Sequence, residues 1–259
     1  MTGILAAIAI SPLFFDSTHE VRSSYQSFGK ILEDRPMQVS EIKIGCRTES
    51  FGRFAIRGRS VSSLTDRRSD AHRHAFYHTE FGPAWQYDAE IAENWILKSD
   101  VTHSWTLYRG FRHGNGDRSY TWVQIDQSLE NPYVTPFGRI RGYYQGSDYL
   151  YFKAGIRKRL EFSDGFYFTP SVYAEGGSGR LQTRNFGKRA DGGKLADGIS
   201  AVSGRLELGW RINANLTAFG YIEQSGVAGG EVRRANAKTP YRCAHNDWTH
   251  GGVGIRVKF

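Results

Sequence analysis

Residues 149–162 read YLYFKAGIRKRLEF, a stretch in which two kinds of side chain alternate. Leu150, Phe152, Ala154 and Ile156 are apolar, whereas tyrosine, lysine, glycine and arginine occupy the positions beside them. Successive side chains of a β-strand point to opposite faces of the sheet, so a period of two predicts a strand with one apolar and one polar face. We expect the fold to be built from strands of this kind.

The same alternation recurs along most of the chain. Marking the runs predicts ten strands, at about 39–59, 75–88, 92–110, 118–127, 134–145, 149–162, 166–177, 199–212, 216–226 and 248–259. Most of them reach or exceed the roughly 9–11 residues with which a tilted strand crosses a bilayer. A hairpin merged into one run, within 39–59 or 92–110, would raise the number to twelve.

The predicted connections differ in length from one end of the strands to the other. The shorter ones are 89–91, 128–133, 163–165 and 213–215. The longer ones are 60–74, 111–117, 178–198 and 227–247, with 146–148 as a short exception. Short turns on one side and long loops on the other are typical of outer-membrane barrels. Both ends of the barrel domain are then expected on the short-turn side.

Composition narrows the class of protein. Glycine supplies 30 of the 259 residues and aromatic residues 14%, so the chain is not of the disordered type, which has few aromatics. Two cysteines are too few for a disulfide scaffold. The longest apolar stretch, Ile4–Ile10, is far shorter than the roughly 18 residues of a transmembrane helix. A soluble all-β protein and a membrane barrel remain.

Three features favour the membrane barrel over a soluble sandwich or lipocalin-like barrel. Aromatic residues gather near the predicted strand ends, as an interfacial girdle requires. The strands are long for a soluble sandwich, and the chain stops inside a strand. We predict an all-β fold, a closed antiparallel transmembrane β-barrel of about ten strands over residues 39–259, preceded at 1–38 by a signal-like segment and a periplasmic linker.

Residues 252–259, GVGIRVKF, resemble the closing strand of bacterial outer-membrane β-barrel proteins, which typically end on Phe after apolar residues at every second position. The resemblance is one of porin-like architecture and singles out no particular family. It implies the outer membrane of a Gram-negative-type bacterium, with the lipid bilayer, lipopolysaccharide and the assembly machinery as partners. The implied assembly signal consists of Val253, Ile255, Val257 and Phe259.

Charged residues fall on the parity opposite to the apolar set, so they are expected to line the lumen. Counting across the predicted hairpins places Lys153 opposite Glu175 and Arg205 opposite Glu223, which predicts two lumen ion pairs. The same counting brings four cations together with few acids beside them: Arg139, Arg141, Lys153 and Arg157. A ring of basic side chains in a pore selects anions. Acids from across the lumen, such as Asp100, Asp126 or Glu207, would instead neutralise this basic cluster and make the interior a plug.

The two longest loops are basic. Lysines and arginines outnumber acids in 178–198 and 227–247, which would suit contact with anionic polysaccharide as well as plain solubility. No motif for nucleic-acid binding is present, and none for a cofactor. We therefore assign the basic residues behind the formal net charge of +8 to the lumen and the loops.

Two groups of histidines fall near the expected outer rim: His72, His74 and His78 with Glu80, and His245 and His250 with Asp247. Such groups can bind a metal or act as acid and base, although an ordinary surface role is the simpler reading. Cys46 and Cys243 fall at different heights in the barrel, so no disulfide between them is expected.

Together these features predict a non-enzymatic outer-membrane barrel, either a narrow channel with a modest preference for small anionic solutes or a structural surface protein. Two alternatives stay open. One is a hydrolase with a rim site built on the histidines, and the other is an adhesion or binding protein that uses the basic loops.

Overall fold

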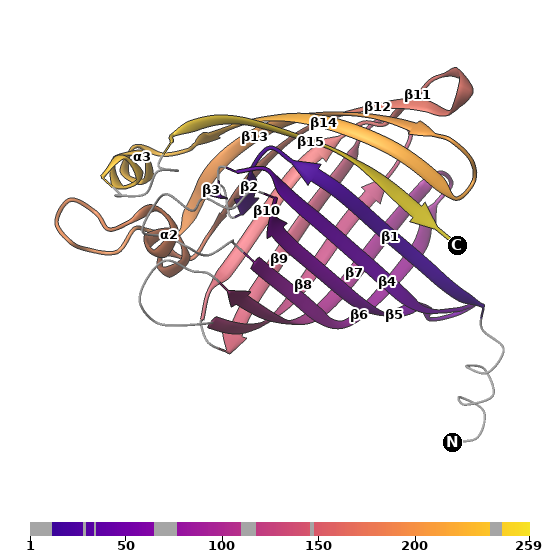
Figure 1. Ribbon diagram of the computed structural model, residues 1–259, viewed down its shortest axis with the longest axis horizontal. Helices are drawn as coiled ribbons and strands as arrows, with labels where there is room; N and C mark the ends of the chain where they lie inside the picture. The colour runs from indigo at the N-terminus through magenta and orange to yellow at the C-terminus, as the bar shows by residue number, and fades with distance from the viewer. Residues whose placement is uncertain are drawn as a thin grey trace.

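Strands dominate the structure, as the alternation predicts (Figure 1). The computed structural model describes residues 12–27, 30–33, 35–64, 77–109, 118–145, 148–238 and 245–259. The barrel strands are β1 (Leu13–Arg22), β4 (Met37–Thr48), β5 (Gly52–Ser63), β6 (Tyr77–Ala92), β7 (Trp95–Arg109), β8 (Arg118–Glu130), β9 (Thr135–Gln145), β10 (Leu150–Arg157) with its continuation β11 (Leu160–Glu161), β12 (Phe166–Gly177), β13 (Gly198–Arg211), β14 (Leu216–Val227) and β15 (Asp247–Lys258). The other elements are β2 (Tyr25–Ser27), β3 (Lys30–Glu33), the 3-10 turn η1 (Ser163–Gly165), α2 (Gly179–Phe186) and α3 (Gly230–Ala237).

All barrel strands pair antiparallel with their neighbours, and the ring is closed. β1 pairs with β4 on one side and with β15 on the other, while β10 pairs with both β9 and β12. Counting β10 and β11 as one interrupted strand gives twelve strands, the higher of the two numbers that the sequence left open. The interruption lies opposite Pro170, which accepts a hydrogen bond from the backbone N–H of Lys158 but has no N–H to return.

The parity of the barrel is the one expected of a membrane protein. Outward-pointing Ile156 and Leu208 are 51% and 64% exposed, whereas Glu175 and Glu223 point inward and are 4% and 3% exposed. A soluble barrel would bury its apolar face instead. The structure therefore has the porin-like fold of an outer-membrane β-barrel. None of the helices among the described residues is long and apolar enough to cross a membrane.

The predicted strand at 39–59 is wrong, because two strands lie there. β4 and β5 meet in a tight turn at 49–51, where the Thr48 hydroxyl accepts a hydrogen bond from the backbone N–H of Phe51 and donates one to the carbonyl of Gly52. Thr48 is paired with Gly52 in register, so even-numbered residues point outward on both strands. The alternation thus runs unbroken through the turn and gives no sign of it.

The barrel also begins earlier than predicted. β1 lies within 1–38, where the sequence suggested only a signal-like segment and a linker. Its lumen face carries acidic Asp16 and Glu20, but Ser17 and His19 interrupt the apolar residues of its outward face. The period of two is therefore weak in this strand. Residues 1–11, which hold the signal-like stretch, lie outside the described residues.

Short turns and both ends of the barrel lie on one side of the molecule, as predicted. The backbone of Phe15 exchanges two hydrogen bonds with that of Phe259, at 3.0 and 2.8 Å. The N–H of Lys258 also donates to the carbonyl of Asn215, in the short turn between β13 and β14. The opposite mouth carries the long connections.

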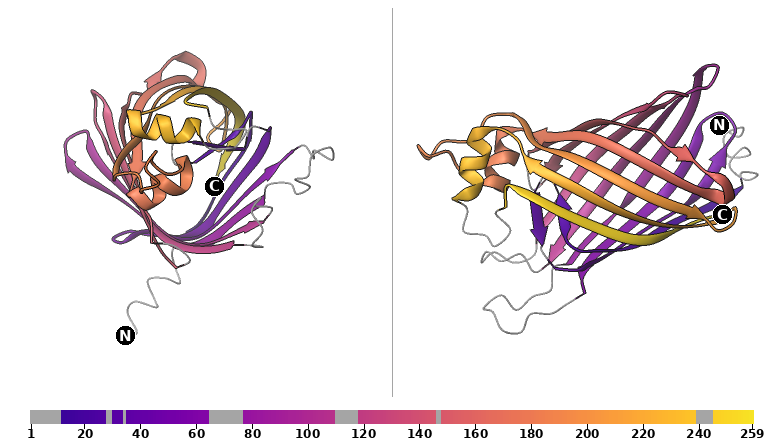
Figure 2. Two further views of the ribbon diagram at one scale, coloured as in Figure 1. Left: turned by 90° about the vertical axis from the view of Figure 1, so that its left-hand side faces the viewer. Right: turned by 90° about the horizontal axis from the view of Figure 1, so that it is seen from above.

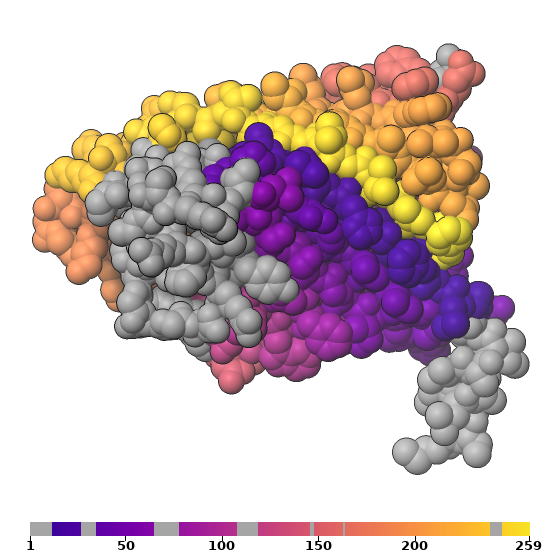
Figure 3. Space-filling view, viewed as in Figure 1, coloured from indigo at the N-terminus to yellow at the C-terminus, as the bar shows by residue number. Residues whose placement is uncertain are grey.

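Two helices cover part of that mouth, above β12–β15 (Figure 2). α2 and α3 interrupt the two basic loops and pack on a small apolar core. The core consists of Phe186, Leu195, Ala201, Val227, Val232, Ala235 and Trp248. The loops predicted as basic and solvated are thus partly folded onto the barrel, and in the space-filling view the molecule narrows toward this capped end (Figure 3).

Candidate functional site: the barrel lumen

Inward-pointing positions carry the polar residues that could act on a solute. Every second residue of each strand faces the lumen, and the cross-strand register places the charged ones in rows around it. The sequence identified most of these residues through their parity. It missed those on β1 and β5, since neither strand was recognised as a separate element.

In the predicted basic cluster, two of the four cations lie near an acid, Arg139 beside Asp126 and Arg141 at 3.9 Å from Glu80. Arg139 on β9 forms an ion pair with Asp126 on β8, with 2.5 Å between nitrogen and oxygen. Arg141 donates to the Gln124 side chain at 2.7 Å and lies over the Trp122 ring at 4.0 Å. The neutralisation considered from the sequence is therefore present for Arg139, through the acid Asp126.

The other two cations rest on aromatic rings. The Lys153 ammonium lies 3.3 Å from the centre of the Tyr173 ring, and the Arg157 guanidinium 5.6 Å from that of Phe137. No carboxylate among the described residues lies within 4.0 Å of either group. Lys153 occupies the register position opposite Glu175, but the Glu175 carboxylate accepts its hydrogen bonds from other groups.

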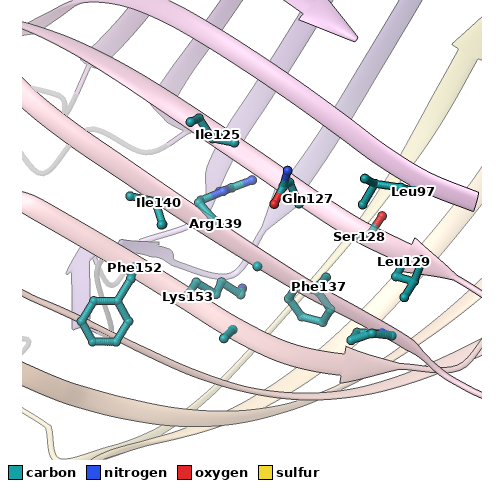
Figure 4. Close-up of a pocket in the computed structure, with 13 residues that line it drawn as sticks. Leu97, Ile125, Gln127, Ser128, Leu129, Phe137, Arg139, Ile140, Phe152 and Lys153 are labelled. Carbon is teal, nitrogen blue, oxygen red and sulfur yellow. The ribbon is translucent and has the colours of Figure 1, made fainter. Parts of the chain in front are cut away.

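A pocket of about 490 Å³ lies along β8, β9 and β10 (Figure 4). Its lining includes Arg139 and Lys153 from the basic cluster, together with Phe137 and apolar residues such as Ile140 and Phe152. Most of the lining residues, Ile140 and Phe152 among them, have the outward parity of the apolar set, so the pocket is a groove on the outer face of the barrel wall that Arg139 and Lys153 only border.

The second predicted pair, Arg205 and Glu223, lies opposite in register with 3.8 Å between nitrogen and oxygen. Arg205 also donates to Glu207 at 2.8 Å, and Arg256 binds the same carboxylate at 2.9 Å. This side of the lumen is thus lined by a connected series of ion pairs that runs from β13 to β15.

Glu80 on β6 is the acid with the most cations around it. Its carboxylate accepts a hydrogen bond from Arg57 at 3.0 Å and shares one with His78 at 3.0 Å. Arg59 and Arg141 lie within 3.6 and 3.9 Å. Because Glu80 is only 1% exposed, this network is closed to bulk water and holds β5, β6 and β9 together. The merged strand at 39–59 hid Arg57 and Arg59 from sequence reasoning.

The segment between β1 and β4 crosses the lumen. The Tyr25 hydroxyl shares a hydrogen bond with His78 on β6 at 3.3 Å, and the next residue, Gln26, donates to Glu175 on β12 at 3.2 Å. β6 and β12 are separated by four strands on one side of the ring and six on the other. The chain therefore spans the lumen near the mouth that carries the long loops, with β2 and β3 inside the barrel (Figures 1 and 2).

Several lumen side chains form stacks of glycine, ring and cation. A Cβ atom on Gly209 would lie 2.0 Å from the Tyr167 ring, and the Arg159 guanidinium lies 3.7 Å from the centre of that ring. A Cβ atom on Gly252 would meet the Tyr221 ring at 2.8 Å, and Arg205 lies 3.7 Å from the centre of that ring. These stacks explain part of the high glycine content.

The histidines form no rim site among the described residues. His78 and His250 both point into the lumen beside glutamates, whereas His72 and His74 lie outside the described residues. No group of three or more described His, Cys, Asp or Glu side chains is arranged to hold a metal ion. Cys46 is a free thiol; Cys243 lies outside the described residues, so the expectation of no disulfide stays a prediction.

Comparison with known proteins gives a likeness in fold. No family model matches the chain, and no curated protein matches it. An outer membrane channel from Pseudomonas putida F1 superposes with a TM-score of 0.52 and 11% identity, over 96% of each chain. A KdgM porin in complex with disordered oligogalacturonate gives a TM-score of 0.46 and 11% identity, over 95% of this chain and 99% of that one. Outer membrane phospholipase A from Escherichia coli gives 0.43 and 12%, over 94% and 89%.

Proposed function

We propose that this protein is a narrow, non-enzymatic channel of the bacterial outer membrane that favours small anionic solutes. The observation that carries the proposal is the position of Lys153 and Arg157. Both face the lumen on β10, and both lie on aromatic rings instead of forming an ion pair with a described carboxylate. A lumen cation that forms no direct ion pair can raise the local concentration of anions in a low-dielectric passage.

The location follows from the outward face. Leu208, Ile156 and Val253 form part of an exposed apolar surface that water would not stabilise and lipid would. Stacked aromatic pairs such as Phe166 and Trp210, with ring centres 5.5 Å apart, lie next to the short turns, where an interfacial girdle is expected. The proposed partners are accordingly the bilayer, lipopolysaccharide at the looped mouth and, through the closing strand at Val253–Phe259, the assembly machinery.

The lumen chemistry supports passage more than catalysis. The imidazoles of His78 and His250 have tyrosine and glutamate as described neighbours, whereas acyl transfer needs a serine or cysteine nucleophile beside the base. The histidine that does lie beside a serine hydroxyl, His19 at 3.0 Å from Ser40, is on the outward faces of β1 and β4 and not in the lumen. The basic loops are also less available for adhesion than the sequence suggested. Arg180, Arg189 and Arg233 form ion pairs with Asp148, Glu231 and Asp247.

The test is the reversal potential of the purified protein in a planar bilayer under a tenfold KCl gradient. The parent is expected to pass chloride in preference to potassium, and Lys153→Gln with Arg157→Gln to move the reversal potential toward zero. Lys188→Gln with Lys194→Gln removes the same charge from an exposed loop and should leave it unchanged. Cation preference in the parent, or equal effects of the two double variants, would refute the proposal.

A further inference from the structure

The groove on the outer face of β8, β9 and β10, which we call the outer groove, has a floor of small residues (Figure 4). Gly138 and Ala154 lie opposite each other in register, and both have the outward parity of the apolar set. Among the described residues, a Cβ atom on Gly138 would have only the carbonyl oxygen of Lys153 within 4 Å, at 3.7 Å. The space above this floor is therefore open.

Larger apolar side chains border the floor on both sides. Toward the looped mouth lie Ile125, Ile140 and Phe152, which are register partners in one row across the three strands. Toward the short turns lie Leu129 and Pro136. The outer groove thus has the apolar character of the bilayer interior, and its volume of about 490 Å³ lies within the range of roughly 300–1,000 Å³ found for small-molecule sites.

One polar side chain lies in this apolar lining. Gln127 is the register partner of Gly138, so it stands in the row that forms the floor. Its side chain is exposed on the outward face and makes no hydrogen bond to another described residue. An amide that faces lipid without a partner is unfavourable, so a polar group of the occupant is expected to meet it.

A cation lies at the short-turn end of the outer groove. Lys158 follows β10 with the same outward parity as Ile156, and its ammonium group donates a hydrogen bond to the carbonyl of Pro132, in the turn between β8 and β9. It forms no ion pair with a described carboxylate. Tyr133 in the same turn is 76% exposed, as an aromatic residue of the membrane interface would be. Because an ammonium group has three donors, Lys158 can still bind a phosphate at this level.

The order of these groups matches that of a glycerophospholipid, which carries its phosphate at the membrane surface, its ester carbonyl groups deeper and its acyl chains deepest. From the short turns inward, the outer groove offers the Lys158 ammonium group, then the Gln127 amide, then the apolar row that includes Ile140. We propose that the outer groove binds one phospholipid, with an acyl chain over Gly138 and the phosphate beside Lys158.

The lipid comes from the periplasmic leaflet. Leu129 and Pro136 lie one residue from the ends of β8 and β9 at the short turns, which are periplasmic in outer-membrane barrels. Lipid tails are as apolar as the groove, so the affinity comes from close packing and from the polar contacts of Lys158 and Gln127. The site depends on the membrane location proposed above but not on conduction.

Native mass spectrometry of the full-length protein in detergent measures the retention of single lipid molecules. Titration with dioleoylphosphatidylglycerol should show one molecule bound ahead of any others, whereas dioleoylglycerol, which lacks the phosphate, should bind more weakly. Gly138→Leu fills the floor and should weaken the binding of both lipids. Gly204→Leu adds the same side chain on the outward face of β13, where nothing lies within 4 Å of a Cβ atom, and should leave both affinities unchanged.

Two variants test the polar contacts and remain informative if Gly138→Leu does not fold. Lys158→Gln should lower the affinity for dioleoylphosphatidylglycerol by about fivefold, which corresponds to the roughly 1 kcal/mol that a lysine contributes beside anionic lipid, and should not affect dioleoylglycerol. Gln127→Leu should weaken the binding of both lipids, because both carry the ester groups. Heat-modifiability on gels confirms that each variant is folded.

Equal binding of the two lipids to the parent, no effect of Lys158→Gln, or equal weakening by Gly138→Leu and Gly204→Leu would overturn the site, because lipid would then adhere to the whole outer face alike. A barrel that conducts anions without retaining the lipid would overturn the site and leave the channel standing. Retention of the lipid without any conductance would do the reverse.

Discussion

The ammonium nitrogen of Lys153 lies 3.3 Å from the centre of the Tyr173 ring on the neighbouring strand β12. An ammonium over an aromatic face contributes roughly 0.5–1 kcal/mol when exposed and about 2 when desolvated. The contact keeps the charge in a fixed place on the wall while leaving it available to a solute. Lys153 is thus in direct contact with a ring, while Glu175, its register partner, makes its hydrogen bonds elsewhere.

Replacing Lys153 by Met separates charge from packing. Met fills a similar volume and can still lie against the Tyr173 ring, so the thermal unfolding of the barrel should change little. The anion preference should fall, because the charge is gone. Heat-modifiability on gels and reversal potentials on the same preparation measure the two effects, and a loss of folding with unchanged selectivity would contradict the assignment.

The double change Arg139→Glu with Arg141→Glu is expected to harm folding more than selectivity. Arg141 lies on Trp122 and bonds to Gln124 and Tyr143, all of them buried. A carboxylate there would lose these contacts, and leaving buried polar groups unpaired costs about 1–3 kcal/mol each. The yield of folded barrel after refolding into detergent should drop well below that of Lys153→Gln with Arg157→Gln.

Lipid exposure can be tested on the outward face. Ile156→Arg or Leu208→Arg should destabilise the barrel by about 2–4 kcal/mol if the residue lies near the bilayer midplane. Thr169→Arg on the lumen face places the new charge opposite Glu207 and should be tolerated better. Tyr151→Arg, also on the lumen face, is a poorer control, since it removes the hydrogen bond to Glu175. The free energy of unfolding in urea, measured in lipid vesicles, compares the variants at Ile156, Leu208 and Thr169.

One strand provides a matched pair of glycines. A Cβ atom at Gly209 would lie 2.0 Å from the Tyr167 ring, whereas nothing lies within 4 Å of one at Gly204. Gly209→Ala should therefore cost about 1–3 kcal/mol through overpacking, and Gly204→Ala should be close to neutral. Combining Gly209→Ala with Tyr167→Ala should recover part of the loss. Equal unfolding midpoints for the two alanine variants would be inconsistent with the packing described.

Freeing the crossing segment should widen the passage. Tyr25→Ala with Gln26→Ala removes the hydrogen bonds to His78 and Glu175 on nearly opposite walls. The segment would then no longer be held across the lumen, and single-channel conductance should increase or become noisy. Ser62→Ala, on the outward face of β5, is a suitable control. A conductance equal to that of the parent would mean that the segment does not limit the flow.

The sequence predicted the architecture well because the barrel repeats one simple rule. Alternation along β10, β12, β13 and β15 placed their lumen faces correctly, and hairpin counting placed Lys153 opposite Glu175. The alternation failed as a guide where the two faces of a strand did not differ clearly, or where it continued across a turn. On β1 Ser17 and His19 interrupt the apolar outward face, and across the turn at Thr48 the parity continues, so neither the strand nor the turn was visible.

The chemistry of the lumen was less accessible to sequence reasoning. Which acid meets Arg139 depends on the neighbouring strand, and Asp126 was only one of several candidates. The Glu80 network depends on Arg57 and Arg59 from a strand that was not recognised. The segment that crosses the lumen at Tyr25 shows no period-two alternation. Its partners, His78 and Glu175, lie far from it in the sequence, so no local pattern could reveal the contacts.

The contacts between glycines and aromatic rings limit which positions of this sequence can be substituted independently during evolution. Outward positions such as Ile156 need only remain apolar, so each can vary alone. Tyr167 and Gly209 cannot, because a methyl group on one strand occupies the space of the ring from the next. Substitutions at such positions should be inherited as correlated pairs, and homologues that gain a side chain at Gly209 should carry a smaller residue in place of Tyr167.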